Sequence, residues 1–292
     1  MSYSASRSEA GTATVEDQDG KIRTDTDYVL GHSDRELERL RRQGALFSDL
    51  TRDLLVRAGL KKAMHVLDIG CGVGDVSLIA ADLVSQEGTV KGIDPAAEAL
   101  AIARMRLDAD GKPWASFSTG TLESLEDCSQ FDAVIGRFIL IHLANPAEAL
   151  SGLRNRLRTG AILSFIEFDL STAAVYPPLT FFQQCIGWVG DVYRRSGRQL
   201  DMGVTLFSTF RAAGLTPQMA GLTRITSAND EAGIDFLVDS VRSLLPAIVN
   251  LGIATEETVE IDTLRQRLLQ ETASDEYCVF YPRLVGAWAI VP

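Results

Sequence analysis

A short glycine-rich segment constrains the fold of this chain more than any other part of its sequence. The segment HVLDIGCGVGDVS, residues 65–77, begins with an apolar run, continues through Gly70, Gly72 and Gly74, and ends in a new apolar stretch. This pattern predicts a strand, a tight turn and the start of a helix. Because glycine lacks a Cβ, the turn lets backbone N–H groups approach a ligand closely at the positive end of a helix. The segment therefore predicts a site for a nucleotide-like cofactor.

Strands and helices alternate on both sides of this turn. We expect strands at residues 64–69, 89–93, 115–119, 133–137 and 161–168, and helices near 74–84, 96–107, 123–125 and 146–158. Such alternation predicts a parallel sheet that helices cover on both faces.

The pattern is less regular beyond residue 170. We expect an aromatic helix around residues 181–193, a helix at 204–213, a strand at 218–225, helices near 232–251 and 256–271, and a final strand at 277–291. The aromatic spacing favours core packing over substrate stacking, although some of these side chains are expected to border the open edge of the sheet. The chain is accordingly divided into a disordered or swapped arm (1–26), an N-terminal helical lid (27–60), a cofactor-binding core (61–170), and a last part with the remaining strands and helical inserts that bind substrate (171–292).

The N-terminal region combines a polar arm with a helix. Residues 1–26 are polar and non-periodic, so the arm is expected to be disordered or to order on a partner, which suggests a homo-oligomer. Ser33 and Glu36 have the spacing of a capping box, and helical periodicity continues to Gly59. This predicts one long helix or two helices broken near Gly44.

Composition excludes several classes of function. The net charge of −11 would repel a phosphate backbone, so nucleic acid is an unexpected substrate. No apolar run reaches the roughly 20 residues that span a bilayer, and the N-terminus lacks the apolar centre of a signal peptide. The four cysteines are far apart, which indicates neither a metal site nor disulfides. We therefore expect a cytoplasmic protein with a small-molecule substrate.

The spacing of the glycines separates two classes of cofactor. The dinucleotide fingerprint G-x-G-x-x-G would need glycine where Asp75 stands, and a carboxylate there would repel a pyrophosphate. An NAD-dependent oxidoreductase is thus a disfavoured alternative. Asp94 ends the next expected strand, where its carboxylate can accept hydrogen bonds from both hydroxyls of a ribose.

Together, these motifs resemble those of the class I S-adenosylmethionine-dependent methyltransferases. The likeness begins with Asp68, the three glycines and the pair Asp94-Pro95. The segment 131–146 (FDAVIGRFILIHLANP) resembles the fourth strand of that family and its following turn, and residues 28–43 are similar to the N-terminal helix of its UbiE-like, small-molecule branch. The resemblance covers about residues 28–168. It implies an α/β, Rossmann-like fold with a seven-stranded, mostly parallel sheet, an antiparallel last strand, helices on both faces and helical inserts.

The resemblance assigns one group of residues to the nucleoside part of S-adenosylmethionine. It implies that Asp94 binds the ribose and that Pro95 flanks the adenine. It also implies that the backbone of Gly120, Thr121 and Leu122 reads the edge of the adenine ring.

A second group is assigned to the methionine part. The resemblance implies that Asp68 orients the glycine loop and holds the methionine ammonium, directly or through water. The backbone carbonyl of Arg137 meets the same ammonium, or the Arg137 side chain pairs instead with an acid. Tyr28 and Gln43, on the expected lid helix, bind the methionine carboxylate.

Two titratable residues are candidates for catalysis. His142 follows the fourth strand closely, and its imidazole could accept a proton from a hydroxyl or ammonium nucleophile, or could only shape the turn. Glu167 and Asp169 share one face of the fifth strand. One of them, with Glu167 as the candidate, could bind a substrate amine or take its proton, or could instead serve in capping or in ion pairing with nearby arginines.

We therefore predict an S-adenosylmethionine-dependent methyltransferase that acts on an O, N or C atom of a small organic molecule, such as a secondary metabolite. The family members that methylate base or amide nitrogens carry Asn/Asp-Pro-Pro-aromatic after the fourth strand, and residues 136–139 (GRFI) do not match it. An alternative is an S-adenosylmethionine-binding protein that catalyses a cyclisation or another non-methylating reaction.

Overall fold

The computed structural model describes residues 15–16, 22–23, 42–197, 202–227, 231–273 and 276–292. Two short strands, β1 (Val15–Glu16) and β2 (Ile22–Arg23), pair antiparallel near the N-terminus. The rest of the expected arm lies outside the described residues, as do Tyr28 and the helix expected from Ser33 to residue 41.

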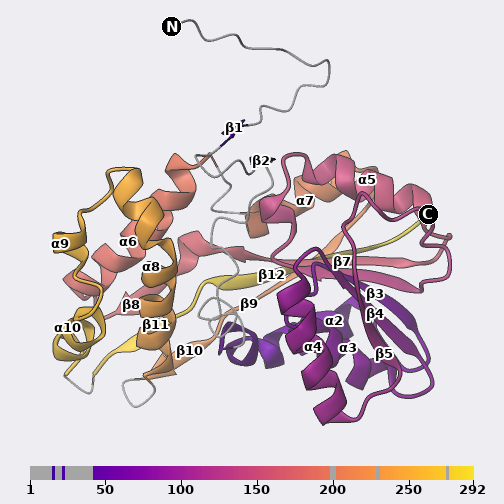
Figure 1. Cartoon of the computed structure of the whole chain (residues 1–292), viewed down its shortest axis with the longest axis horizontal. Coiled ribbons are helices and arrows are strands. Elements are labelled where there is room, and N and C mark those ends of the chain that lie inside the picture. Colours follow the sequence, from indigo (N-terminus) through magenta and orange to yellow (C-terminus); the bar gives the residue numbers. More distant parts are fainter. Residues whose placement is uncertain (1–14, 17–21, 24–41, 198–201, 228–230, 274–275) are drawn as a thin grey trace, which may run out of the picture.

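A seven-stranded sheet forms the centre of the molecule (Figure 1). Its strands lie in the order β5-β4-β3-β6-β7-β12-β9. Their bounds are β3 (His65–Ile69), β4 (Thr89–Asp94), β5 (Ala115–Thr119), β6 (Ala133–Arg137), β7 (Ile162–Asp169), β9 (Gln218–Leu222) and β12 (Arg283–Ile290). The first five in this order are parallel, and β12 runs antiparallel to both β7 and β9. The predicted fold class is therefore confirmed.

Helices cover both faces of this sheet (Figure 1). On one face lie α2 (Ser48–Ala58), α3 (Asp75–Val84) and α4 (Ala97–Asp110), and on the other lie α5 (Pro146–Arg156) and α7 (Met202–Ala212). The alternation of β12 explains this: Leu284 and Trp288 pack into the hydrophobic cluster that contains α2 and α3, whereas Ala287 packs into the cluster of α5 and α7. Burial on both faces matches the apolar sequences of these strands.

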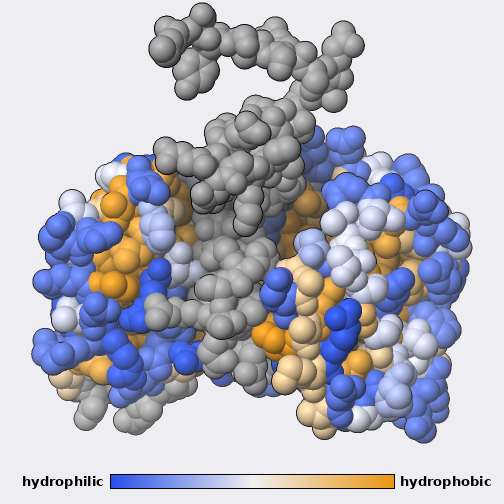
Figure 2. Space-filling model, viewed as in Figure 1, coloured by the Kyte–Doolittle hydropathy of each residue, from blue (hydrophilic) through white to orange (hydrophobic). Residues whose placement is uncertain are grey.

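A smaller lobe lies beside the sheet (Figure 1). It contains α6 (Thr180–Arg195), α8 (Ala232–Asn250), α9 (Glu256–Val259), α10 (Leu264–Glu271) and an antiparallel sheet of β8 (Ala174–Tyr176), β11 (Cys278–Phe280) and β10 (Ile225–Ser227). Hydrophilic side chains cover most of the visible surface of both lobes (Figure 2). In the part of the chain that the structure describes, no helix is long and apolar enough to cross a membrane.

Four element predictions beyond the parallel strands need correction. The expected strand 277–291 is two strands in different sheets, because the chain turns at Tyr281 and Pro282, and proline cannot donate to a ladder. The expected strand 218–225 likewise divides into β9 and β10. The helix predicted at 256–271 is interrupted where Glu260 adopts a left-handed φ of +43°. Residues 123–125 form a turn instead of a helix.

Phe47 connects the two lobes. Residues 42–46 are helical, and Phe47 stands in a turn immediately before α2. Its side chain is fully buried, and its ring lies 5.1 Å from that of Phe168 in β7, 5.6 Å from Phe236 in α8 and 5.8 Å from Tyr281. One aromatic side chain thus joins the N-terminal helices, the central sheet and the smaller lobe.

We expect the substitution Phe47→Ala to lower the free energy of unfolding by about 3–5 kcal/mol, because it leaves a cavity among three rings. Urea denaturation followed by circular dichroism measures this change. Val56→Ala, at a half-exposed position of α2, is the control and is expected to stay within about 0.5 kcal/mol of wild type. Equal effects of the two substitutions would contradict the role given to Phe47.

Candidate cofactor and substrate site

A cavity of about 1210 Å³ opens at the carboxyl ends of the parallel strands. Its walls come from the glycine loop after β3, the ends of β4, β5, β6 and β7, and the helices α6 and α8 of the smaller lobe. Ligand sites in open α/β sheets occupy this edge. Since a pocket for one small molecule measures roughly 300–1,000 Å³, this cavity has room for two ligands side by side.

The glycine loop adopts a backbone that other residues rarely enter. Gly70, Gly72 and Gly74 have φ values of +65°, +52° and +86°. A Cβ on Gly70 would lie 2.1 Å from Cδ1 of Ile139, whereas one on Gly72 would meet nothing within 4 Å. Gly70 and Gly72 line the cavity, and Gly74 caps the N-terminus of α3 beneath it. The loop therefore offers backbone groups to a ligand with no side chain in the way.

Asp94 supports this loop from the end of β4. Its Oδ2 accepts a hydrogen bond from the Gly72 N–H at 2.9 Å, and its Oδ1 accepts one from the Ala96 N–H at 2.8 Å. Each carboxylate oxygen keeps a second lone pair. Because Asp94 and Pro95 both line the cavity, the residues present fit the ribose contact that the sequence predicts.

Asp68 lies behind the loop and not on the wall of the cavity. Its buried carboxylate accepts a hydrogen bond from Ser77 Oγ at 2.6 Å. Burial raises the pKa of Asp68 to about 7, although the Ser77 hydrogen bond and the charge of Arg137 oppose that shift. The side chain thus ties β3 to α3, and its contact with a ligand ammonium stays a prediction.

The loop after β5 lines the cavity with Gly120, Thr121 and Leu122. The Gly120 N–H donates to the carbonyl of Asp94, and the Thr121 N–H donates to Ser124 Oγ. In the described part of the chain, the Leu122 N–H has no such acceptor. Of the three backbone donors expected to read adenine, this one is available.

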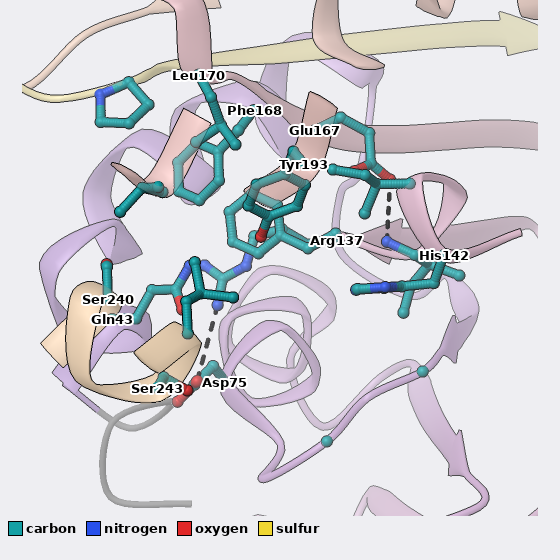
Figure 3. A pocket seen from close by; sticks show the side chains of 18 of the residues that line it. Gln43, Asp75, Arg137, His142, Glu167, Phe168, Leu170, Tyr193, Ser240 and Ser243 are labelled. Carbon is teal, nitrogen blue, oxygen red and sulfur yellow. Dashed lines mark hydrogen bonds and ion pairs between the residues drawn. The ribbon is translucent and has the colours of Figure 1, made fainter. Parts of the chain in front are cut away.

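Arg137, at the end of β6, is buried and belongs to a network of charged side chains (Figure 3). Its Nη1 donates to Thr51 Oγ1 at 2.8 Å, and its Nη2 lies 3.7 Å from Asp75 Oδ2. Asp75 Oδ1 accepts a hydrogen bond from Arg106 Nη1 at 2.7 Å. The sequence allowed an acidic partner for Arg137 but did not identify Asp75 as that partner, because Asp75 served there only as an argument against a dinucleotide.

The N-terminal helix reaches the same network. Gln43 is buried and lines the cavity beside Arg137 and Asp75 (Figure 3). The next residue, Gly44, packs so closely on Asp75 that an added Cβ would lie 1.9 Å from Oδ2. Glycine at this position therefore allows the helix to approach the loop.

Glu167 holds the turn that follows β6. Its side chain is fully buried, and Oε1 accepts hydrogen bonds from the N–H groups of Ile139 and Leu140 at 2.9 and 2.7 Å. Among the described residues, Oε2 has no partner. Burial raises the pKa of Glu167 to about 8, which the backbone hydrogen bonds partly oppose.

His142 lies on the turn that Glu167 holds, at the end of a 3₁₀ helix, η1 (Leu140–His142) (Figure 3). The turn begins at Phe138, whose φ of +61° is strained for a residue with a Cβ. Both His142 and Glu167 line the cavity. The structure therefore brings the two catalytic candidates to one turn.

The part of the cavity beyond this turn is apolar and aromatic. The rings of Phe138 and Phe168 stack 4.1 Å apart with an interplanar angle of 22°. Further lining side chains from α6 and α8 are Phe182, Ile186, Val189, Tyr193, Phe236 and Leu237. We call this part the acceptor chamber. The sequence pattern favoured core packing over substrate stacking for the aromatic helix, with part of the helix at the open edge of the sheet, and side chains of this helix do line the cavity.

Comparisons with known proteins agree with this geometry. A model of the methyltransferase domain family matches residues 60–185. An uncharacterized 37.1 kDa protein in transposon Tn4556 of Streptomyces fradiae is 34% identical over 188 residues, which are 57% of this chain and 52% of that protein. The chloroplastic 2-phytyl-1,4-beta-naphthoquinone methyltransferase of Arabidopsis thaliana is 30% identical over 140 residues, or 46% of this chain and 51% of that enzyme.

A solved structure supports the fold. YcgJ of Bacillus subtilis superposes with a TM-score of 0.53 at 17% identity, covering 83% of this chain and 99% of that protein. The chain spans about half the length of these two curated relatives. Residues 60–185 therefore match a methyltransferase domain, and S-adenosylmethionine is the methyl donor of the class I methyltransferases that the sequence motifs resemble.

The burial of Glu167 predicts a pH dependence of stability. In the unfolded chain this carboxyl ionises near its ordinary pKa of 4.5, whereas in the folded protein its pKa is about 8. As pH rises from 5 to 8, the unfolded state loses this proton first, so the free energy of unfolding falls. We expect wild type to lose stability relative to Glu167→Gln over this range in urea denaturation. Asp68 titrates in both proteins and cancels in the difference, and parallel curves would contradict the prediction.

Proposed function

We propose that the protein transfers the methyl group of S-adenosylmethionine to an O, N or C atom of a small, largely apolar organic molecule, such as a secondary metabolite. The observation that carries this proposal is the single cavity, in which a glycine loop and Asp94 form one end and the acceptor chamber forms the other. The naphthoquinone in the name of the Arabidopsis relative supports an apolar ring as acceptor.

The strand order arranges the cofactor end. The loop of Leu122 follows β5, Asp94 ends β4, and the glycine loop follows β3, and these three strands are neighbours in the sheet. A nucleoside with its adenine at Leu122 and its ribose at Asp94 therefore extends its remaining part over Gly70 and Gly72. When bound, S-adenosylmethionine supplies an activated methyl carbon and a good leaving group.

The chain itself has to align the acceptor and exclude water. Positioning and desolvation account for much of the acceleration that such a site can provide. Stacked Phe138 and Phe168 and the apolar side chains of α6 offer a dry wall for a flat or lipophilic molecule. We assign acceptor binding to the helices α6 and α8 of the smaller lobe, which belong to residues 171–292.

His142 and Glu167 are assigned different tasks at this wall. Glu167 Oε1 is engaged by two N–H groups, so Oε2 is the atom that would hydrogen-bond an acceptor. With a pKa of about 8, this carboxyl is mostly protonated at neutral pH and acts as a donor. His142 would then accept the proton of an acceptor whose nucleophile starts protonated.

Calorimetry with S-adenosylhomocysteine tests the cofactor assignment. We expect wild type to bind and Asp94→Ala to weaken binding roughly tenfold or more, because a charge-assisted hydrogen bond contributes about 1.5–3 kcal/mol. The control Asp108→Ala removes an exposed carboxylate of the same protein from α4 and should leave the affinity unchanged. Absence of binding by wild type would refute the proposed function.

The acceptor chamber can be tested by filling it. Gly187 of α6 lines the cavity, and a Cβ there would meet nothing within 4 Å. We expect Gly187→Leu to weaken binding of the neutral apolar fluorophore 1-aminoanthracene several-fold, while the affinity for S-adenosylhomocysteine stays within twofold of wild type. Gly152→Leu, in open space on α5, is the matched control. A Gly187 variant that binds the fluorophore like wild type would argue against this chamber.

A further inference from the structure

We propose that the guanidinium of Arg137 binds the carboxylate at the amino-acid end of the cofactor. This inference rests on the proposed function, since it needs S-adenosylmethionine in the cavity. It assigns to the side chain a role separate from the expected contact of the Arg137 backbone carbonyl with the ammonium.

The first observation is that Arg137 uses few of its hydrogen-bond donors in the described structure. Its side chain is only 6% exposed, and a guanidinium carries five N–H donors. In the described structure its one hydrogen bond runs from Nη1 to Thr51 Oγ1, and Nε is buried without an acceptor. Unpaired buried donors on a group that stays charged are costly. The side chain is therefore built to receive an anion.

The second observation is the charge balance of the network. Asp75 Oδ1 lies 2.7 Å from Arg106 Nη1, whereas Asp75 Oδ2 lies 3.7 Å from Arg137 Nη2. One carboxylate is thus shared by two guanidinium groups and is held more closely by Arg106. Asp68, the other acid near Arg137, has its pKa raised to about 7 and is partly neutral at physiological pH. The two guanidinium groups therefore carry more charge than these two acids, which favours an added anion at Arg137.

The third observation is the position of Arg137 in the strand order. The loop of Leu122 follows β5, Asp94 ends β4, and the glycine loop follows β3. Arg137 ends β6, which is the next strand in the sheet. A ligand that places its base at β5 and its ribose at β4 reaches β3 and β6 with its amino-acid end. Gln43 lies beside Arg137 at this point and adds an amide to the same wall (Figure 3).

Thr51 fixes the direction of the guanidinium. Its hydroxyl is fully buried, donates to the Phe47 carbonyl at 2.8 Å and accepts from Arg137 Nη1. Because both ends of this hydrogen-bond chain are held by the core, Arg137 is oriented before a ligand arrives. Such preorganisation lowers the entropic cost of binding.

The test compares two ligands by calorimetry on the full chain. S-adenosylhomocysteine carries the amino-acid carboxylate, whereas 5′-methylthioadenosine has the same adenine, ribose and sulfur without it. We expect Arg137→Gln to weaken S-adenosylhomocysteine binding by roughly tenfold or more and to leave 5′-methylthioadenosine within twofold of wild type. Arg137→Lys, which keeps the charge, should fall between wild type and the Gln variant for S-adenosylhomocysteine.

Asp94→Ala is the matched control. Both ligands carry a ribose, so we expect this substitution to weaken the binding of both to a similar degree. Retained 5′-methylthioadenosine binding also reports that the Arg137 variants are folded. Equal weakening of both ligands by Arg137→Gln and Arg137→Lys, or no weakening of S-adenosylhomocysteine, would overturn the carboxylate assignment. Failure of wild type to bind either ligand would instead refute the proposed function itself.

Discussion

The two hydrogen bonds that Asp94 accepts from the backbone place the glycine loop relative to the sheet. One comes from Gly72 in the loop and the other from Ala96 just before α4. The carboxylate therefore ties the ends of β3 and β4 and the start of α4 to a single point. The parallel pairing of β4 with β3 and β5 holds these strands in register. The loops that follow the three strands therefore keep fixed positions relative to Asp94.

Buried charges around this point give the site its polarity. Asp68 precedes the glycine loop in the chain and Asp75 follows it. Asp75 pairs with Arg106 and Arg137, and the charge of Arg137 also acts on Asp68. Removing charges from water is expensive unless they are paired and hydrogen-bonded. Here the pairing is incomplete at Arg137, which is what makes that side chain available to a ligand.

The acceptor chamber depends on the same core as the cofactor end. Phe47 contacts the rings of Phe168 in β7 and Phe236 in α8, and Phe168 in turn stacks on Phe138 at the cavity wall. The strained backbone of Phe138 is held by the hydrogen bonds that Glu167 accepts from the next two residues. The aromatic contacts that pack the smaller lobe against the sheet therefore also shape the acceptor chamber.

Local patterns in the sequence determined the parallel strands and the cofactor turn. The expected strands 115–119 and 133–137 match β5 and β6, and the glycines at 70, 72 and 74 adopt the left-handed backbone that only glycine enters easily. Alternation, apolar runs and glycine spacing act within a few residues, so one sequence suffices to interpret them. The family resemblance added the roles expected for the site residues.

Only the tertiary structure decided the partners of these residues. Arg137 meets Thr51 and Asp75 from distant parts of the chain, and α6 packs against α8 so that residues of both helices line the cavity. The division of the expected last strand between two sheets follows from the turn at Tyr281 and Pro282. Contacts between distant segments leave no periodic pattern in the local sequence, because they depend on how complete helices and strands pack. The acceptor chamber is formed by such packing.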